Sequence, residues 1–363
     1  MRNIRKYLRS SKLFSEIFYS LHIDDLMVRF KFGEFENSIN AAIKRFAPEV
    51  MFGSEKELRK LKKQIRHSYY VCKSSPDEYF LMGLSDFNDK GKCTFVTDKF
   101  LFMTMAKIAS RKKHDEEIED KYGFYNLAKP YFKRQVVMVN SPNDYESFQS
   151  MALEVRDLIL KPLDACMGKG IEAVTITDEV HAKEVFERIV NNGKWVVEER
   201  IKQVKQMADW NESCVNTVRF LSFLNPKTGF NAITPFFRTG RRGAIVDNAG
   251  SGGIFANVDV KTGTLCTDGI DEMGKRYEEH PDSHLKFRGW QIPQYDDLVG
   301  MVKEMHQTIM PSHPYIGWDL ALTDKGWVVI EANWGQFINQ YADHIGRKQE
   351  FMEYVTGNKY SIS

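Results

Sequence analysis

The sequence predicts a mixed α/β (α+β) protein in which a mainly helical N-terminal region precedes two domains built from strands and helices. Three observations carry this prediction. Apolar residues recur at helical spacing through residues 1 to about 95. Short runs rich in β-branched residues begin only after Tyr131. Helix-like segments such as 181–191 separate these runs, as expected where helices pack against sheets.

The chain is long and close to neutral in charge. Its 363 residues exceed what one hydrophobic core usually organises, so we expect two or three parts, the first of them the helical region 1–95. The balance of 51 basic against 49 acidic residues leaves a net charge of +2, which gives a nucleic-acid-binding role little support. Any anion-binding site must therefore be local.

Cysteine usage and hydropathy predict a cytoplasmic protein. The five cysteines are scattered and no two form a CxxC pair, so free thiols are expected rather than a zinc site. Near the N-terminus, Glu16, Asp24 and Asp25 interrupt the apolar residues, and no signal-peptide core is recognisable. No apolar run is long enough to span a membrane.

Local patterns predict the individual elements. Ile39, Ile43 and Phe46 have helical spacing, and Pro48 predicts a break after them. The charge-dense segment 54–66 is interpreted as the solvated face of a helix. The mixed-charge segment 110–120 is interpreted as a helix or connector. Seven runs are predicted as strands: 136–139, 158–160, 174–177, 195–197, 218–223, 231–237 and 327–330.

A lysine and a glycine-rich loop follow the predicted strand 158–160. Lys161 stands at the end of this strand, and Gly168, Lys169 and Gly170 come shortly after it. Glycines let backbone N–H groups approach phosphate oxygens, and a lysine at a strand end supplies a positive charge. The P-loop pattern GxxxxGK[ST] is absent. By itself, the pattern fits a surface turn with a solvated lysine better than a phosphate site.

The strongest pattern is a predicted β-hairpin, in which 317–323 and 327–333 flank a turn that contains glycine. Glu331 and Asn333 are two residues apart, so on a strand they share a face. Asp319 on the partner strand could face them. Two carboxylates and an amide are hard oxygen donors that suit Mg²⁺ or Mn²⁺ bridging nucleotide phosphates. The alternative is a set of polar residues on the wet face of the hairpin.

Two arginines and an asparagine form a further candidate group. Arg219 and Arg238 each lie in or beside an apolar strand, and Asn248 follows in a glycine-rich segment. A buried arginine needs an anionic partner, so each either binds a substrate anion or forms a structural salt bridge. Charged residues follow the predicted strand 195–197. Taken alone, they indicate only that the chain leaves the sheet there.

Taken in order, these motifs resemble the ATP-grasp superfamily. The segment 216–253, with NTVRF, FFRTG and DNAGSGGI, resembles its sugar-transfer-associated branch in particular, as does 280–293. The resemblance covers roughly residues 95–340. It implies a fold in which two α/β subdomains, at 96–200 and 201–363, clamp ATP.

The resemblance assigns binding roles residue by residue. Lys121, in the segment DKYGFY, matches the first nucleotide-binding lysine, and Lys161 matches the second. Lys99 also follows an aspartate, but the distance from Lys121 to Lys161 fits the family better. The implied ligands of Mg²⁺ (or Mn²⁺) are Asp319, Glu331 and Asn333. The other implied ATP-binding positions are Gly168, Lys169 and Gly170 in the phosphate loop and Glu198, Glu199 and Ile201 in the adenine hinge.

The resemblance also implies an activity. The protein would be an ATP-dependent carboxylate–amine ligase that acts through an acyl phosphate, on a sugar acid or amino acid in cell-surface polysaccharide synthesis. Its substrates would be small-molecule or glycan-linked carboxylates and amines. Arg219, Arg238 and Asn248 would hold the transferring phosphoryl group or the acceptor carboxylate. A kinase with a hydroxyl acceptor and a non-catalytic ATP-binding accessory protein remain alternatives, although the complete Asp-Glu-Asn set argues against the second.

The segment 280–293 is a hypothetical acceptor site. Its prolines and glycine predict a loop. Trp290 offers a flat apolar face for a sugar ring, Arg288 could meet a carboxylate, and His280 lies in the same loop. The alternative is a surface connection in which Trp290 packs into the core.

Overall fold

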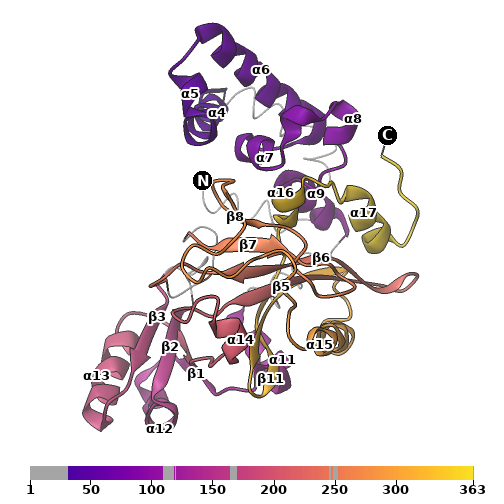
Figure 1. Ribbon diagram of the computed structural model, residues 1–363. Coiled ribbons are helices and arrows are strands. Elements are labelled where there is room, and N and C mark those ends of the chain that lie inside the picture. Colours follow the sequence, from indigo (N-terminus) through magenta and orange to yellow (C-terminus); the bar gives the residue numbers. More distant parts are fainter. Residues whose placement is uncertain are drawn as a thin grey trace.

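The protein consists of a cluster of helices, a large central sheet and a smaller sheet at one edge of it (Figure 1). The computed structural model describes residues 32–108, 118, 120–163, 170–244, 247 and 252–362. Most of the predicted connector 110–120 lies outside the described residues, as do Gly168, Lys169 and Asn248.

Helices make up the described part of the N-terminal region, as the apolar spacing predicts. They are α4 (Phe32–Phe46), α5 (Pro48–Met51), α6 (Glu55–Cys72), α7 (Pro76–Leu81), the 3-10 helix η1 (Leu84–Asp86) and α8 (Asp89–Lys92). Ile39, Ile43 and Ile65 are fully buried in the core that these helices share. Pro48 interrupts the first helix, as predicted, and lies in the first turn of the next, where its missing N–H needs no partner.

The 18-residue helix α6 exposes most of its charged side chains, which confirms the solvated face expected at 54–66. Its opposite side buries Ile65, Tyr69 and Cys72. No helix in the described part of the chain combines the length and the apolarity that crossing a bilayer requires.

One helix and one glutamine side chain tie the helical region to the large sheet. The helix α9 (Asp98–Ile108) contributes Leu101 to the core that also holds Phe223 of that sheet. The side chain of Gln340 accepts a hydrogen bond from the Val96 N–H at 3.0 Å and donates one to the Val96 carbonyl at 2.9 Å. Gln340 therefore pairs with the backbone of Val96 as a neighbouring strand would.

The smaller sheet has four antiparallel strands in the order β1-β4-β2-β3. Its strands and covering helices are β1 (Val136–Val139), β2 (Asp157–Pro162), β3 (Glu172–Thr175), β4 (Trp195–Glu199), α12 (Tyr145–Val155) and α13 (Glu179–Val190). Both helices lie on one face and share a core with Leu160 and Val197. Because side chains alternate along a strand, Lys161 and Glu198 point to the opposite face.

The larger sheet has seven strands in the order β11-β10-β5-β6-β7-β8-β9. They are β5 (Thr217–Asn225), β6 (Gly229–Thr239), β7 (Ile254–Asn257), β8 (Gly269–Asp271), β9 (Arg276–Tyr277), β10 (Tyr315–Thr323) and β11 (Gly326–Asn333). The hairpin predicted at 317–333 is present as β10 and β11, and Gly326 closes its turn with a φ of 84°. The described strand pairs of both sheets are all antiparallel, so α+β is the more specific fold class.

A β-bulge at Ile330 sets the direction of the polar side chains on β11. Asp319 pairs with Glu331, whereas the next residue, Leu320, pairs with Val329 and skips Ile330. The extra residue reverses the alternation of side chains. Val329 therefore joins the core on one face, while Glu331 contacts Asp319 on the other.

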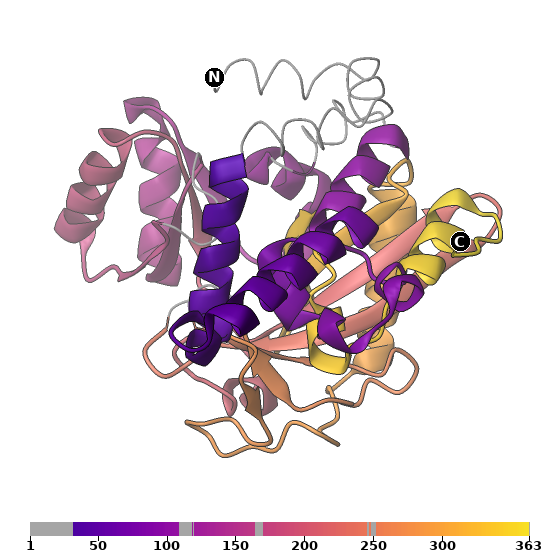
Figure 2. The ribbon, with the colours of Figure 1, turned by 90° about the horizontal axis from the view of Figure 1, so that it is seen from above.

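Helices cover both faces of the large sheet (Figures 1 and 2). They are α11 (Lys121–Phe132) and α15 (Tyr295–Thr308) on one face, and α9, α16 (Asn339–Asp343) and α17 (Lys348–Thr356) on the other. Phe220 and Trp318 point to the α15 face, whereas Tyr315 points to the α17 face. By the alternation of side chains, Arg219 and Asp319 lie on the α17 face.

A buried histidine on α15 supports the sheet beneath Asp319. The His306 Nε2–H donates to the His313 carbonyl at 2.8 Å, and Nδ1 accepts from the Ser222 hydroxyl at 2.7 Å. The Ser222 oxygen in turn accepts from the Trp318 indole N–H at 2.7 Å. These bonds require the neutral ring, and burial lowers the pKa of His306 to about 4.

We expect this histidine to make folding stability pH-dependent. Its ordinary pKa is 6.5 and its folded value about 4, so below pH 6.5 the unfolded chain gains a proton that the folded protein does not. The stabilisation is complete above pH 6.5 and is lost as the pH falls toward 4. His306→Gln should remove about 2 to 3 kcal/mol of the difference in unfolding free energy between pH 7.5 and pH 4.5, measured by urea denaturation.

Met305→Leu is the control, because Met305 is a buried neighbour on the same helix that does not titrate. It should change the free energy of unfolding equally at both pH values. An unchanged pH dependence in His306→Gln would contradict a buried neutral His306.

Candidate functional site

Charged side chains from both sheets meet in one group, which we call the inter-sheet site. Its members are Arg134, Lys161, Glu198, Arg219, Arg238, Asp247, Asp319, Glu331 and Asn333. The ammonium group of Lys161, on the small sheet, lies near enough to the large sheet to lower the pKa of Glu331. Arg134 connects the sheets directly, because it donates to Glu198 and also to the Val329 carbonyl at 2.8 Å.

Asp319 is the centre of the part on the large sheet. The strand register sets Arg219, Asp319 and Glu331 side by side on β5, β10 and β11. Arg219 donates to both carboxylate oxygens of Asp319, and its third donor reaches the Asn333 side-chain oxygen at 3.0 Å. Arg238, from β6, lies 3.0 Å from Asp319 Oδ2. The buried carboxylate therefore has two arginine partners.

The two carboxylates of the hairpin differ in protonation. Burial alone would raise the pKa of Asp319, but Arg219 and Arg238 lower it well below its usual range. Glu331 is exposed as a residue, yet its carboxyl group is partly removed from water. This desolvation, followed by repulsion from Asp319, raises the pKa of Glu331. Asp319 is therefore ionised, and Glu331 is the carboxyl group that takes up a proton first.

The oxygens of Asp319, Glu331 and Asn333 fit a hard divalent cation by their chemistry and by their common face. Among the described residues, no three His, Cys, Asp or Glu side chains form a metal-binding cluster. The protein can thus offer two carboxylates and one amide, and nucleotide phosphates would have to supply further oxygens. Because Arg219 bonds both Asp319 and Asn333, a bound cation would compete with Arg219 for these oxygens.

A second aspartate anchors Arg238. Asp247 accepts a hydrogen bond from the Thr217 hydroxyl, and its carboxylate lies 3.4 Å from Arg238 Nε. Thr217 also accepts from Arg238 at 2.9 Å. Arg238 is thus held on both sides, by Asp247 and by Asp319. Asn248, the third predicted catalytic residue, lies outside the described residues.

Glu198 is the buried carboxylate of the small sheet. Lys161 donates to its Oε1 at 2.6 Å, and Arg134 donates to its Oε2 from Nε at 2.9 Å and from Nη2 at 2.7 Å. Burial alone would raise the pKa of Glu198, but Lys161 and Arg134 lower it to about 2. Both carboxylate oxygens of Glu198 therefore take part in ion pairs. The predicted contacts to adenine would have to come from the backbone of this residue.

Of the two candidate first lysines, Lys121 lies beside Lys161. Asp120 caps the N-terminus of α11, and the ammonium group of Lys121 donates to the carbonyls of Pro162 and Leu163 at 3.2 and 3.3 Å. Lys99 instead contacts the Tyr69 hydroxyl in the helical region, at 2.5 Å.

The rest of the predicted nucleotide site is only partly described. Gly170 is described and has a φ of 74°, a conformation that glycine adopts without strain. The carboxylate of Glu199 accepts from the Gln135 N–H at 3.1 Å, and the backbone of Glu199 also pairs with Gln135. Ile201 lies two residues beyond the end of β4. These contacts hold the end of β4 against the residue that precedes β1.

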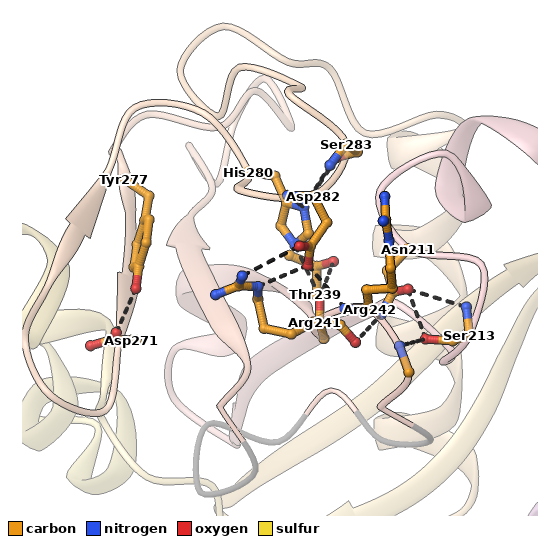
Figure 3. A network of polar contacts seen from close by, with 12 residues as sticks. Asn211, Ser213, Thr239, Arg241, Arg242, Asp271, Tyr277, His280, Asp282 and Ser283 are labelled. Atoms are coloured by element: carbon orange, nitrogen blue, oxygen red, sulfur yellow. Dashed lines mark hydrogen bonds and ion pairs between the residues drawn. The ribbon is translucent and has the colours of Figure 1, made fainter.

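The predicted acceptor residues do not join the inter-sheet site. His280 is fully buried, with Nε2 donating to the Gly240 carbonyl at 3.0 Å and Nδ1 accepting from the backbone of Asp282 and Ser283, both at 3.3 Å (Figure 3). Both ring nitrogens are used within the protein. His280 thus holds its own loop in place, next to Asp282, which pairs with Arg241 at 2.8 Å (Figure 3).

Trp290 and Arg288 also contact residues of the loop and its neighbours rather than members of the inter-sheet site. The Trp290 ring lies 5.3 Å from the ring of Phe237, whose side chain points to the α15 face, opposite to its neighbour Arg238. Arg288 donates to the Asp268 carboxylate and to the Cys266 carbonyl, each at 2.6 Å. The expectation that this loop folds over the acceptor side stays a prediction, and the contacts described here tie Trp290 and Arg288 to neighbouring core and loop residues.

Sequence reasoning missed Arg134 and Asp247. Arg134 stands two residues before β1, where a charged side chain is ordinarily solvated, yet only 4% of its side chain is exposed. Asp247 precedes a glycine-rich segment, yet it is buried on Arg238. Arg134 binds Glu198, 64 residues away, and Asp247 binds Thr217, 30 residues away, and no local sequence pattern predicts either contact.

A profile of the sugar-transfer associated ATP-grasp family matches residues 84–349. The chain belongs to this family. None of the curated proteins matches the sequence.

Solved structures similar to this ATP-grasp protein include ligases. D-alanyl-alanine synthetase A from Vibrio cholerae is 14% identical over 69% of this chain and 66% of its own, with a TM-score of 0.41. D-Alanine-D-alanine ligase from Helicobacter pylori is 14% identical over 74% and 68%, with a TM-score of 0.41. The ATP-grasp ligase PsnB in complex with a minimal precursor is 10% identical over 70% and 68%, with a TM-score of 0.41. The chain thus spans about two thirds of these proteins, and the family assignment rests on the profile.

A close glycine contact in this ATP-grasp protein provides a test of the hairpin site. A Cβ on Gly317 would lie 2.7 Å from the Gly335 Cα and 3.0 Å from the Asn333 side-chain oxygen. Gly317→Ala should therefore displace Asn333 and the following turn. We expect the affinity for a non-hydrolysable ATP analogue in the presence of Mg²⁺ to fall about tenfold, measured by titration calorimetry.

Gly300→Ala is the matched control, because a Cβ there meets nothing within 4 Å and lies on an exposed part of α15. It should leave the affinity unchanged. Equal affinities of Gly317→Ala and the unmodified protein would show that Asn333 does not contribute to binding.

Proposed function

We propose that this ATP-grasp protein is an ATP- and Mg²⁺-dependent ligase that joins a carboxylate to an amine through an acyl phosphate. One observation supports the proposal most: Asp319, Glu331 and Asn333 share one face and lie opposite Lys161 of the other sheet. Hard oxygen donors opposite a lysine form a site suited to a metal-bound polyphosphate. Family membership supports ATP as the nucleotide.

The small sheet would bind the nucleotide. Lys121 and Lys161 would hold the phosphates, helped by the loop residues Gly168, Lys169 and Gly170. The adenine edge would meet the backbone of Glu198, Glu199 and Ile201 at the end of β4. Lys121 donates to the carbonyls of 162–163, the residues that follow Lys161, and this supports the arrangement, since a phosphate chain needs several cations close together.

The large sheet would carry the chemistry. A cation held by Asp319, Glu331 and Asn333 would supply positive charge to the phosphates. Arg219 would bind the transferring phosphoryl group or the acceptor carboxylate, because its planar fork already holds a carboxylate in two-point contact. Arg238, buried between two aspartates, would keep Asp319 ionised and in place.

The proposed reaction has two steps. A carboxylate oxygen of the acceptor attacks the γ-phosphorus of ATP, the bond to the bridging oxygen breaks, and ADP leaves. The amine nitrogen then attacks the acyl carbon, phosphate leaves with its oxygen, and the amine loses a proton to solvent. The residues described above lower the barrier of the first step by stabilising charge that moves onto ADP.

We also propose a sugar acid or an amino acid as the carboxylate substrate and a role in cell-surface polysaccharide synthesis inside the cell; the family is described only as associated with sugar transfer. The experiment is to incubate the protein with ATP, Mg²⁺ and pools of uronic acids and amino acids and to follow ADP release. With hydroxylamine in place of the amine, we expect a hydroxamate of the acid substrate. A stable phosphate ester would instead identify a kinase, and ATP binding without turnover an accessory protein.

Two substitutions should separate binding from turnover. Lys161→Ala should weaken ATP binding about tenfold to a hundredfold, because a charged hydrogen bond to phosphate is lost in the ground state and the transition state alike. Glu331→Gln should keep most of the ATP affinity but lower kcat about a hundredfold or more. The measurements are titration calorimetry and ADP release.

Lys183→Ala is the control, because Lys183 pairs with Glu187 on the exposed side of α13. It should leave both quantities unchanged. Near-normal turnover of Glu331→Gln would remove Glu331 from the proposed metal ligands.

A further inference from the structure

Glu198 binds two cations that differ in how firmly they are held. Arg134 makes two bonds to Glu198, and its Nη1 donates to the Val329 carbonyl at 2.8 Å and to the Phe132 carbonyl at 3.2 Å. Its guanidinium also lies 4.4 Å from the centre of the Phe132 ring. Lys161 makes one bond to Glu198, at 2.6 Å, and 17% of its side chain is exposed. Arg134 is thus fixed by groups on both sheets, whereas Lys161 makes one hydrogen bond within the part of the chain that the structure describes.

The difference matters if Lys161 is to bind phosphate. A lysine that turns from Glu198 to a nucleotide leaves the carboxylate behind, and a buried carboxylate without a partner is strongly unfavourable. Only 8% of the Glu198 side chain is exposed, so water cannot replace the lysine. Arg134 remains in two-point contact with Glu198 and keeps the charge compensated.

We propose that Arg134 is a fixed counter-ion that allows Lys161 to leave Glu198 and bind the nucleotide phosphates, an inference that rests on the proposed function. Arg134 is a positioning residue in this proposal, since it touches Glu198 and not the nucleotide. Arg134 also donates to the Val329 carbonyl. This bond connects the release of Lys161 from Glu198 to β11, the strand that carries Glu331. The same arginine therefore orients the phosphate-binding lysine and holds β11 beside it.

The large sheet also pairs a buried carboxylate with two cations. Arg238 contacts Asp319 and is anchored by Asp247 and Thr217. Among the described residues, Arg219 donates hydrogen bonds to Asp319, in two-point contact, and to Asn333. In contrast to the small sheet, the cation in two-point contact is here the one beside the proposed metal ligands.

The test compares ligands with and without phosphates. In Arg134→Met, Lys161 becomes the remaining cation on Glu198, so the lysine should stay there. We expect the affinity for a non-hydrolysable ATP analogue with Mg²⁺ to fall at least about tenfold, and the affinity for adenosine to change less than about twofold. The double variant Arg134→Met/Glu198→Gln should regain affinity to within about threefold of the unmodified protein, because no carboxylate then retains the lysine.

Arg188→Met is the matched control, because Arg188 pairs with Glu172 at 2.8 Å on the outer part of the same domain. It should bind both ligands normally. If Arg134→Met fails to fold in thermal melts, Arg134→Lys retains the charge and should show a smaller loss of analogue affinity, again restored by Glu198→Gln.

Three outcomes overturn the inference while the proposed function stands. They are an analogue affinity unchanged by the Arg134 substitutions, an equal loss for adenosine and the analogue, and a double variant no better than the single one. A purely structural link between the sheets predicts the last two. An unmodified protein that binds no ATP analogue would overturn the proposed function itself, and this inference with it.

Discussion

Two carboxylates that are almost removed from water determine the rest of this structure. Each of them, Asp319 in the large sheet and Glu198 in the small one, is held by two cations. Burying a charge is unfavourable unless its partners arrive with good geometry, so the chain must bring four cations to defined places. Those cations come from positions as far apart in the sequence as Arg134 and Arg238. Each carboxylate finds its cations on or beside its own sheet, and Arg134 joins the two sheets through its additional bond to the Val329 carbonyl.

The fold meets this requirement through strand register and one irregularity. Antiparallel pairing places Arg219, Asp319 and Glu331 on neighbouring strands, and the bulge at Ile330 turns Glu331 toward Asp319. Without the extra residue, Glu331 would point with Val329 into the core on the other face. A buried network of Trp318, Ser222 and His306 fixes the opposite face of the same strands. The positions of the charged side chains on one face of the large sheet thus depend on the packing of Trp318, Ser222 and His306 on the opposite face.

Much of the fold could be predicted from the sequence, because its signals are local. β-Branched runs marked seven strands, helical spacing marked the N-terminal helices, and a glycine-containing turn marked the hairpin that carries Asp319 and Glu331. The bulge at Ile330 could not be predicted, since it depends on how β11 pairs with β10. The burial of Arg134 could not be predicted either, because a charged residue before a strand is normally solvated. Trp290 lies on the α15 face of the large sheet, where it packs against Trp210 and Phe237. The composition of the loop does not predict which face its tryptophan contacts.

The helical core and the last helix show that the limits of the family match differ from the physical limits of the fold. The family match begins at Leu84, inside the helical core that also contains Ile39. It ends at residue 349, within α17, yet Phe351 of that helix is completely buried beneath the large sheet. A fragment cut at the limits of the family match would lose Phe351 and so expose its aromatic neighbours under the large sheet. At the other end it would lose Ile39 and expose the rest of the helical core. Recombination between relatives would therefore have to exchange the flanking helices together with the segment that the family profile matches.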